Sequence, residues 1–395
     1  MFNKLEIFPE EIIDINDGWK RSCTLVLTGE QIKKQETLWW EYPKEVLKGE
    51  SSDCDSYLLS TFLLAMKHRA DLYVHGTISH ELLSNITELQ KVWSKWLPEV
   101  YNEINIHVSK VTESTVYSNN AIVAFSGGAD AQFTTYRHSK GLAGYRTKNI
   151  SAGVFVHGFD IPLNDNDGFN GAAKRAKLAL DDLGISLICV RTNVREVLSL
   201  NWEHYCGSAL SSVLHAFKYI AGYGLIASGE SYDNLVIPWG SNPITDPLLS
   251  SSNFFIVHDG AGFSRSEKIK TLANWNEGVK QLRVCWSGGV HDRNCGKCEK
   301  CVRTRLNFLL AGVEQPDCFD TPFEIQMLSQ IALASDAARA EWLMIKDEMI
   351  NLGINQSLIK EVDKVIKRPA VKFSKILPVG SIRREWVKNF LGKNK

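Results

Sequence analysis

The sequence has no excess of charge of either sign, because 45 lysine and arginine residues balance 45 aspartate and glutamate residues in a chain of 395. This balance gives the whole chain no electrostatic attraction to nucleic acid, so we expect nucleic acid not to be a partner. No stretch approaches the roughly 18 consecutive apolar residues that a membrane helix needs. Residues 1–11 are acidic early and lack the apolar run of a signal peptide. We therefore expect a cytoplasmic protein without membrane contact.

Disulfide pairing has little support in the sequence. Five of the nine cysteines lie far apart, at Cys23, Cys54, Cys189, Cys206 and Cys318, with no spacing that indicates a framework. Such scattered thiols, together with a thiolate metal site, are typical of a reducing compartment.

The other four cysteines are close together in the sequence. Cys285, Cys295, Cys298 and Cys301 fall within seventeen residues, and the last three have the spacing C-x2-C-x2-C. Thiolates this close can converge on one tetrahedral ion. The spacing predicts a structural zinc ion (Zn2+) with four thiolate ligands. The alternative is a group of buried or redox-active cysteines.

The pattern of apolar residues changes near residue 119. Before it, strand-like runs at 23–28 and 72–75 alternate with helical patterns at 55–66 and 79–101. After it, short apolar runs at 121–125, 153–157, 185–191 and 224–229 alternate with helical patterns, which predicts a buried parallel sheet. Helices are expected from 322 to 353 and from 356 to 366. The prediction is an α/β protein with an α+β N-terminal domain at 1–115, a nucleotide-binding domain at 116–320 and a helical C-terminal extension at 321–395.

One strand-to-helix junction has the composition of an anion-binding loop. It comprises Phe125, Ser126, Gly127, Gly128, Ala129, Asp130 and Ala131. Two glycines let the backbone approach a ligand, and the N–H groups of the turn and the helix start point at one place. The loop is neither a Walker A sequence nor the dinucleotide fingerprint. The alternative is a tight turn that closes one βα unit.

Further candidate ligand-binding residues follow other predicted strands. Val156 and His157 end the second strand, and Gly229 lies in a turn after the fourth. Arg265 and Lys268 are three residues apart, so both could face one ligand from the start of a helix and neutralise phosphates. For any single one of these cations, solvation at the surface is the alternative.

These residues carry a family resemblance. The strand that ends in Ser126-Gly127-Gly128-x-Asp130 resembles the loop of the N-type ATP pyrophosphatases, the PP-loop superfamily. The cysteine run, followed by Arg303, is similar to the zinc site of the 7-cyano-7-deazaguanine synthases within that superfamily. The resemblance covers about residues 119–315, and it implies a five-stranded parallel sheet of the adenine-nucleotide-hydrolase-like type.

The resemblance also implies a reaction. A 7-deazaguanine-type acid, 7-carboxy-7-deazaguanine in that family, attacks the α-phosphorus of ATP to give an acyl adenylate and pyrophosphate, and an amine then displaces AMP. The chain would thus be an ATP-dependent C–N ligase. The loop N–H groups would hold pyrophosphate, Asp130 would orient the loop or Mg2+, and Lys268 with Arg265 would stabilise phosphate charge.

The chain departs from the family where the loop ends, because Ala131 stands in place of a serine. This change and the N-terminal domain suggest an acceptor larger than ammonia, such as a protein or peptide amine. An RNA-modifying enzyme of the same superfamily and a non-catalytic nucleotide-binding module remain as alternatives, and a homodimer is left open. Ten lysines and arginines against one acid from Lys364 onward could contact an anionic partner or form a solvated tail.

Overall fold

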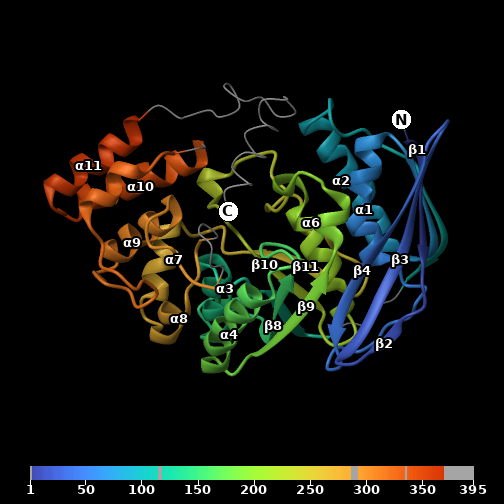
Figure 1. Cartoon of the computed structure of the whole chain (residues 1–395), viewed down its shortest axis with the longest axis horizontal. Helices are drawn as coiled ribbons and strands as arrows, with labels where there is room; N and C mark the ends of the chain where they lie inside the picture. Colours follow the sequence, from blue (N-terminus) through green and yellow to red (C-terminus); the bar gives the residue numbers. More distant parts are fainter. Residues whose placement is uncertain (1, 114–117, 286–291, 334–335, 369–395) are drawn as a thin grey trace.

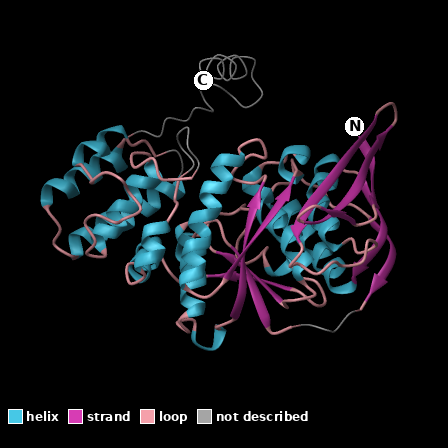
Figure 2. Ribbon diagram, turned by 60° about the horizontal axis from the view of Figure 1, so that its bottom comes forward, coloured by secondary structure: helices cyan, strands magenta, loops and turns pink. Residues whose placement is uncertain are grey.

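The computed structural model describes residues 2–113, 118–285, 292–333 and 336–368, and its centre is one mixed β-sheet (Figure 1). Eleven strands belong to this sheet, and the main path runs in the order β11-β10-β7-β8-β9-β4-β3-β1-β5-β6, with β2 paired to β3. Helices lie beside the sheet, and the C-terminal helices gather at the side away from the N-terminal strands (Figure 2).

Five neighbouring strands of the sheet are parallel. They are β7 (Asn120–Ala124), β8 (Asn149–His157), β9 (Ser186–Thr192), β10 (Tyr223–Ala227) and β11 (Phe255–Asp259). The crossovers contain α3 (Ala129–Ser139), α4 (Asn166–Asp182), α5 (Val194–Leu198) and α6 (Trp202–Leu214). Ala121, Ile122 and Val123 are fully buried, as expected for a strand covered on both faces. The apolar runs therefore predicted this part of the sheet correctly.

The predicted five-stranded sheet is nevertheless wrong for the sheet as a whole. The N-terminal region adds β1 (Phe2–Pro9), β2 (Ile13–Ile15), β3 (Gly18–Gly29), β4 (Lys33–Pro43), β5 (Asp71–Ser79) and β6 (Ile106–Thr112). β4 pairs antiparallel with β9, at Trp40 with Thr192 and Glu41 with Arg191. This pairing covers an edge of the parallel strands that would otherwise expose its backbone N–H and C=O groups.

The N-terminal helices pack into the same core as the parallel strands. α1 (Asp55–His68) is buried along most of its length, and α2 (His80–Trp96) ends earlier than the predicted residue 101, just before Pro98. Trp93 of α2 is 1% exposed and packs against Trp96, Tyr101 and His204. Trp93 therefore serves the packing of the core.

A group of charged residues, the junction charges, is buried where α1 meets the end of α6. Lys218 Nζ lies 2.7 Å from Asp53 Oδ2 and 3.0 Å from Asp55 Oδ2. Arg21 donates to the Asp53 carbonyl at 2.5 Å and to the Tyr57 hydroxyl at 3.2 Å. Two cations thus face two carboxylates inside the core, as buried charges require.

The C-terminal part is helical, and a separate core that includes Leu306, Trp342 and Val362 joins its last three helices. It contains α7 (Arg265–Leu272), α8 (Asn276–Gln281), α9 (Glu299–Leu310), α10 (Asp336–Asn351) and α11 (Gln356–Lys367). The helix predicted from 322 is interrupted, because Ile325–Gln330 forms a 3-10 helix before α10 begins. Most of the predicted basic tail, residues 369–395, lies outside the described residues. Among the residues that are described, no helix has the length and apolar character to cross a membrane.

Candidate nucleotide site and cysteine cluster

The predicted anion-binding loop connects β7 to α3. Gly127 has a φ of +74°, a conformation that favours glycine, and Gly128 is the N-cap of α3. The Gly128 N–H donates to Ser126 Oγ at 3.3 Å, which holds the turn. The N–H groups in the first turn of a helix have no intrahelical acceptor and carry the positive end of the helix dipole. The loop therefore has the geometry of an anion site.

A cavity of about 290 Å³ opens beside this loop. Eight of the predicted site residues line it: Phe125, Ser126, Gly128, Ala129, Asp130, Ala131, Val156 and Arg265. Apolar side chains of β8 and α6 form another part of the wall, including Phe155, Trp202 and Leu210. A polar loop thus faces an apolar wall, an arrangement typical of small-molecule sites.

Asp130 connects the loop to α7. Its Oδ2 lies 2.8 Å from Arg265 Nη1, and its Oδ1 lies 3.1 Å from Lys268 Nζ. Lys268 also donates to the carbonyl of Ser228 at 2.7 Å, at the end of β10. Both carboxylate oxygens are engaged by cations, so this geometry supports the orienting role for Asp130 rather than ligation of Mg2+.

The charges of these three residues depend on one another. Burial tends to raise the pKa of Asp130, but the positive charges of Arg265 and Lys268 outweigh it and lower the pKa below its usual value. Burial lowers the pKa of Lys268, and Arg265 adds to that effect while Asp130 opposes it. An anionic ligand beside Lys268 would therefore favour the protonated, charged amine.

Four predicted site residues do not line the cavity: Lys268, Gly127, His157 and Gly229. Gly127 uses its carbonyl to accept a hydrogen bond from the Arg283 N–H at 2.9 Å. His157 stacks on Phe169 with ring centroids 4.2 Å apart, and its Nε2 contacts the Pro162 carbonyl at 2.8 Å. These contacts indicate that His157 packs at the end of its strand and does not face the cavity.

Gly229 likewise contributes through its backbone, because its carbonyl accepts a hydrogen bond from Arg265 Nη2 at 3.4 Å. This hydrogen bond helps to fix the side chain of Arg265, which lines the cavity.

Several charged residues of the cavity wall were not predicted as site residues. Arg283, Lys300 and Arg303 line the cavity with Arg265, and Asp160 is the second carboxylate beside Asp130. Asp160 follows β8 and could have been chosen because ligands bind at the carboxyl ends of parallel strands. Lys300 and Arg303 lie on α9, a helix that was not predicted because it begins within the cysteine run.

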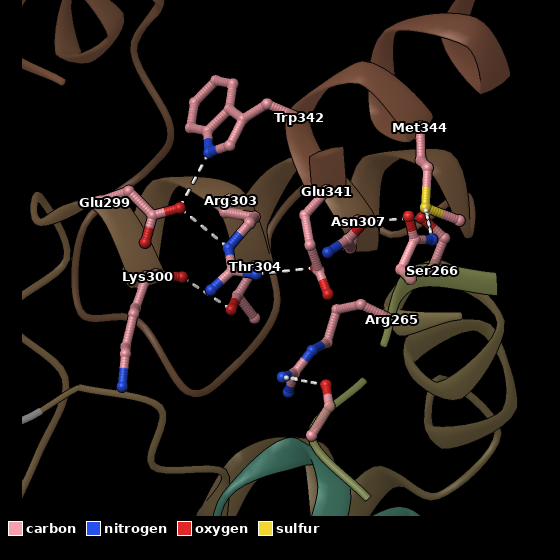
Figure 3. A network of polar contacts seen from close by, with 12 residues as sticks. Arg265, Ser266, Glu299, Lys300, Arg303, Thr304, Asn307, Glu341, Trp342 and Met344 are labelled. Carbon is pink, nitrogen blue, oxygen red and sulfur yellow. Dashed lines mark hydrogen bonds and ion pairs between the residues drawn. The ribbon is translucent and has the colours of Figure 1, made fainter. Parts of the chain in front are cut away.

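Arg303 is held by carboxylates of two helices (Figure 3). Its guanidinium lies 2.9 Å from Glu299 of α9 and 2.7 Å from Glu341 of α10. Trp342 of α10 donates its ring N–H to Glu299 at 2.8 Å. The C-terminal helices thereby fix the orientation of a cation in the cavity wall.

The absence of a hydroxyl at Ala131 is not compensated by its neighbours. Thr134 donates to Asp259 Oδ2 at 2.9 Å, and Thr135 donates to the Ala131 carbonyl at 2.7 Å. Neither threonine replaces the missing loop hydroxyl, because both hydroxyl groups have partners within the core.

The four clustered cysteines converge as their spacing predicts. Their sulfur atoms all lie within 4.8 Å of one another, and Cys295 Sγ is 3.8 Å from Cys301 Sγ. Four sulfurs bound about 2.3 Å from one zinc ion would lie about 3.8 Å apart, so the donor set fits zinc. The N–H of Cys295 approaches Cys285 Sγ at 3.2 Å, which also suits a thiolate acceptor.

The cysteine cluster is linked directly to the cavity. Cys298 is the N-cap of α9 and Cys301 lies in its first turn, so the cluster fixes the start of the helix that carries Lys300 and Arg303. Zinc with four protein ligands has no open position, so it would supply structural stability here.

Comparison with known proteins gives one partial likeness. A 7-cyano-7-deazaguanine synthase from Rhizobium rhizogenes is 31% identical to this chain over 100 residues. The aligned stretch covers 25% of this chain and 36% of the synthase, so the chain spans about a third of that relative. No protein-family model matches the chain, and no solved structure matches it.

Proposed function

We propose that this protein is an ATP-dependent ligase that adenylates a carboxylic acid and transfers the acyl group to an amine. The acid is a 7-deazaguanine derivative, 7-carboxy-7-deazaguanine, by analogy with the partial relative, whose name states that it makes a 7-deazaguanine nitrile. The acceptor is ammonia or a larger amine such as a protein or peptide N-terminus. A PP-loop domain at 116–320 would carry this reaction.

One observation carries the proposal. The loop from Ser126 to Asp130 opens on the same cavity as four cationic residues, which are Arg265, Arg283, Lys300 and Arg303. Backbone N–H groups at a helix start and several cations around one small cavity are what a polyphosphate requires. The apolar wall around Trp202 offers a surface for planar rings.

The residues of the cavity would act by positioning and by neutralising charge. The loop N–H groups would hold the departing pyrophosphate, and Arg265 with Lys268 would stabilise the charge that it gains. Lys300 and Arg303, which line the same cavity, would hold the carboxylate of the acid near the α-phosphorus. Holding the carboxylate of the acid and the triphosphate of ATP in contact would contribute much of the rate acceleration at such a site.

The direct test is incubation of the purified protein with ATP, Mg2+ and 7-carboxy-7-deazaguanine. We expect acid-dependent release of pyrophosphate, and we expect a Lys268→Met variant to lose it by about 100-fold or more. Lys270→Met is the matched control, because Lys270 is exposed on the same helix. No pyrophosphate or AMP with any acceptor would contradict the proposal.

A further inference from the structure

A second, larger cavity adjoins the candidate nucleotide site. It has a volume of about 700 Å³ and is formed by the segment after β8 together with α5. Phe159 and Asp160 belong to the walls of both cavities, so these two residues separate them. The second cavity also includes Arg195 and Glu196.

The partition between the cavities is rigid and mostly aromatic. Phe159 and Trp202 pack with ring centroids 5.1 Å apart, and Arg195 covers the Trp202 ring at 4.2 Å. Arg195 also donates to the Phe159 carbonyl at 2.5 Å, which fixes the backbone next to Asp160. Asp160 is therefore a carboxylate held in place at the boundary, and its side chain is 23% exposed.

We propose that the second cavity binds the amine acceptor and that Asp160 binds its protonated amino group at the boundary with the nucleotide site. This inference rests on the proposed function, because it needs an acyl adenylate in the first cavity. The ligand is a primary ammonium group, either ammonium itself or the N-terminus of a peptide. The larger volume of the second cavity favours the peptide.

The chemistry requires a proton acceptor at this boundary, since only a neutral amine is nucleophilic. The Asp160 carboxylate takes one proton from the ammonium group. The free amine attacks the acyl carbon, the bond from that carbon to the phosphate oxygen of AMP breaks, and AMP leaves with the electron pair. The second amine proton passes to solvent. Burial raises the pKa of Asp160, although Arg283, Arg195 and Lys300 oppose it, and this makes the carboxylate a better base.

The two half-reactions allow a test that separates this inference from the proposed function. Exchange of labelled pyrophosphate into ATP, in the presence of acid, reports adenylation alone. Amide formation with ammonium chloride or with triglycine reports transfer. We expect Asp160→Asn to keep pyrophosphate exchange within about threefold of the wild type and to slow amide formation by about 100-fold, a usual size for a lost general base.

Glu203→Gln is the matched control, because Glu203 is an exposed carboxylate next to Trp202 that lines neither cavity. We expect it to change amide formation less than about threefold. Wild-type exchange without any effect of Asp160→Asn on transfer would overturn the inference and leave the proposed function intact. Equal losses in both half-reactions would also overturn it, because Asp160 would then serve the first cavity. No exchange in the wild type would instead contradict the proposed function.

Faster transfer to triglycine than to ammonium would identify a peptide as the acceptor, and the reverse would identify ammonia. In either case the loss in Asp160→Asn is expected to appear with the preferred amine.

Discussion

Two groups of largely buried charges in this protein, at the junction and at the cavity, are composed differently. At the junction, Lys218 and Arg21 face Asp53 and Asp55, so that positive and negative residues are equal in number. At the cavity, four cationic residues and two carboxylates line the wall, counted among the described residues, and Glu299 and Glu341 pair with Arg303. Both groups are costly to remove from water.

This difference indicates two purposes. Charges that balance within the chain stabilise the packing of α1 against the end of α6 and have no need of a ligand. Cationic side chains that line a cavity beside a helix N-terminus can in addition bind an anionic ligand there. The comparison predicts that substitutions at the junction chiefly change stability, whereas substitutions at the cavity chiefly change ligand binding.

Loss of zinc should have the largest effect and should change both stability and ligand binding, because the cysteine cluster holds the helix that carries two cavity cations. We expect about one zinc per chain by metal analysis, and loss of the metal with loss of soluble protein in Cys298→Ser. Structural zinc sites contribute about 10 kcal/mol or more of folding free energy. Cys318→Ser is the control, since Cys318 is buried nearby but is not part of the cluster. A fully folded, metal-free Cys298→Ser protein would contradict the structural role of zinc.

Substitution of the central junction lysine should have the next largest effect. Lys218→Met leaves Asp53 and Asp55 facing each other without their shared cation, so we expect a loss of about 3–5 kcal/mol in the free energy of unfolding. Urea denaturation measures this change. Lys67→Met, at an exposed position of α1, should change the free energy by less than about 0.5 kcal/mol. Comparable effects from the two variants would show that the junction charges do not stabilise the fold.

The pH dependence of stability gives a second test of the junction, because His215 is buried there beside Lys218. Burial, with the charge of Lys218, lowers the pKa of His215 to about 3, although the Ser211 carbonyl opposes the shift. The unfolded chain binds a proton at His215 with a pKa near 6.5, whereas the folded protein keeps His215 neutral until the pH approaches 3. The free energy of unfolding therefore falls as the pH drops from about 6.5 towards 3. Between pH 7 and pH 5 this amounts to about 2 kcal/mol.

Urea denaturation of wild type and His215→Gln at both pH values measures that contribution. We expect the variant to lose about 2 kcal/mol less than the wild type over this pH range. An identical pH dependence in the two proteins would show that His215 takes up its proton in the folded state.

The smallest expected effect belongs to the loop residue that departs from the family pattern. Ala131→Ser adds a hydroxyl to the cavity wall at the first turn of α3, where it could donate to a phosphate. A hydrogen bond to a charged group contributes about 1.5–3 kcal/mol, so we expect ATP to bind at least about tenfold more tightly. Isothermal titration calorimetry checks this, and unchanged affinity would place the phosphates away from residue 131.

The sequence predicted the parallel strands and the convergence of the cysteines well, for local reasons. Continuous apolar runs identify buried strands, and closely spaced cysteines can bind one ion without knowledge of the rest of the fold. The pairing of β4 with β9 was not predictable in this way, because residues 40 and 192 are brought together only by tertiary structure. Asp160 follows a strand that the sequence predicted, but its place between two cavities depends on α5 and α6.

The most direct test of the account is a paired measurement on Lys268→Met and Lys218→Met. For each variant, urea denaturation gives the stability, and the rise in melting temperature with ATP gives the binding. We expect Lys268→Met to lose no more than about 1–2 kcal/mol, since Arg265 still pairs with Asp130, and to lose its response to ATP. Lys218→Met should be less stable and keep the response. A Lys268→Met protein that is as destabilised as Lys218→Met, yet still responds to ATP like the wild type, would contradict the role of the group formed by Asp130, Arg265 and Lys268 in nucleotide binding.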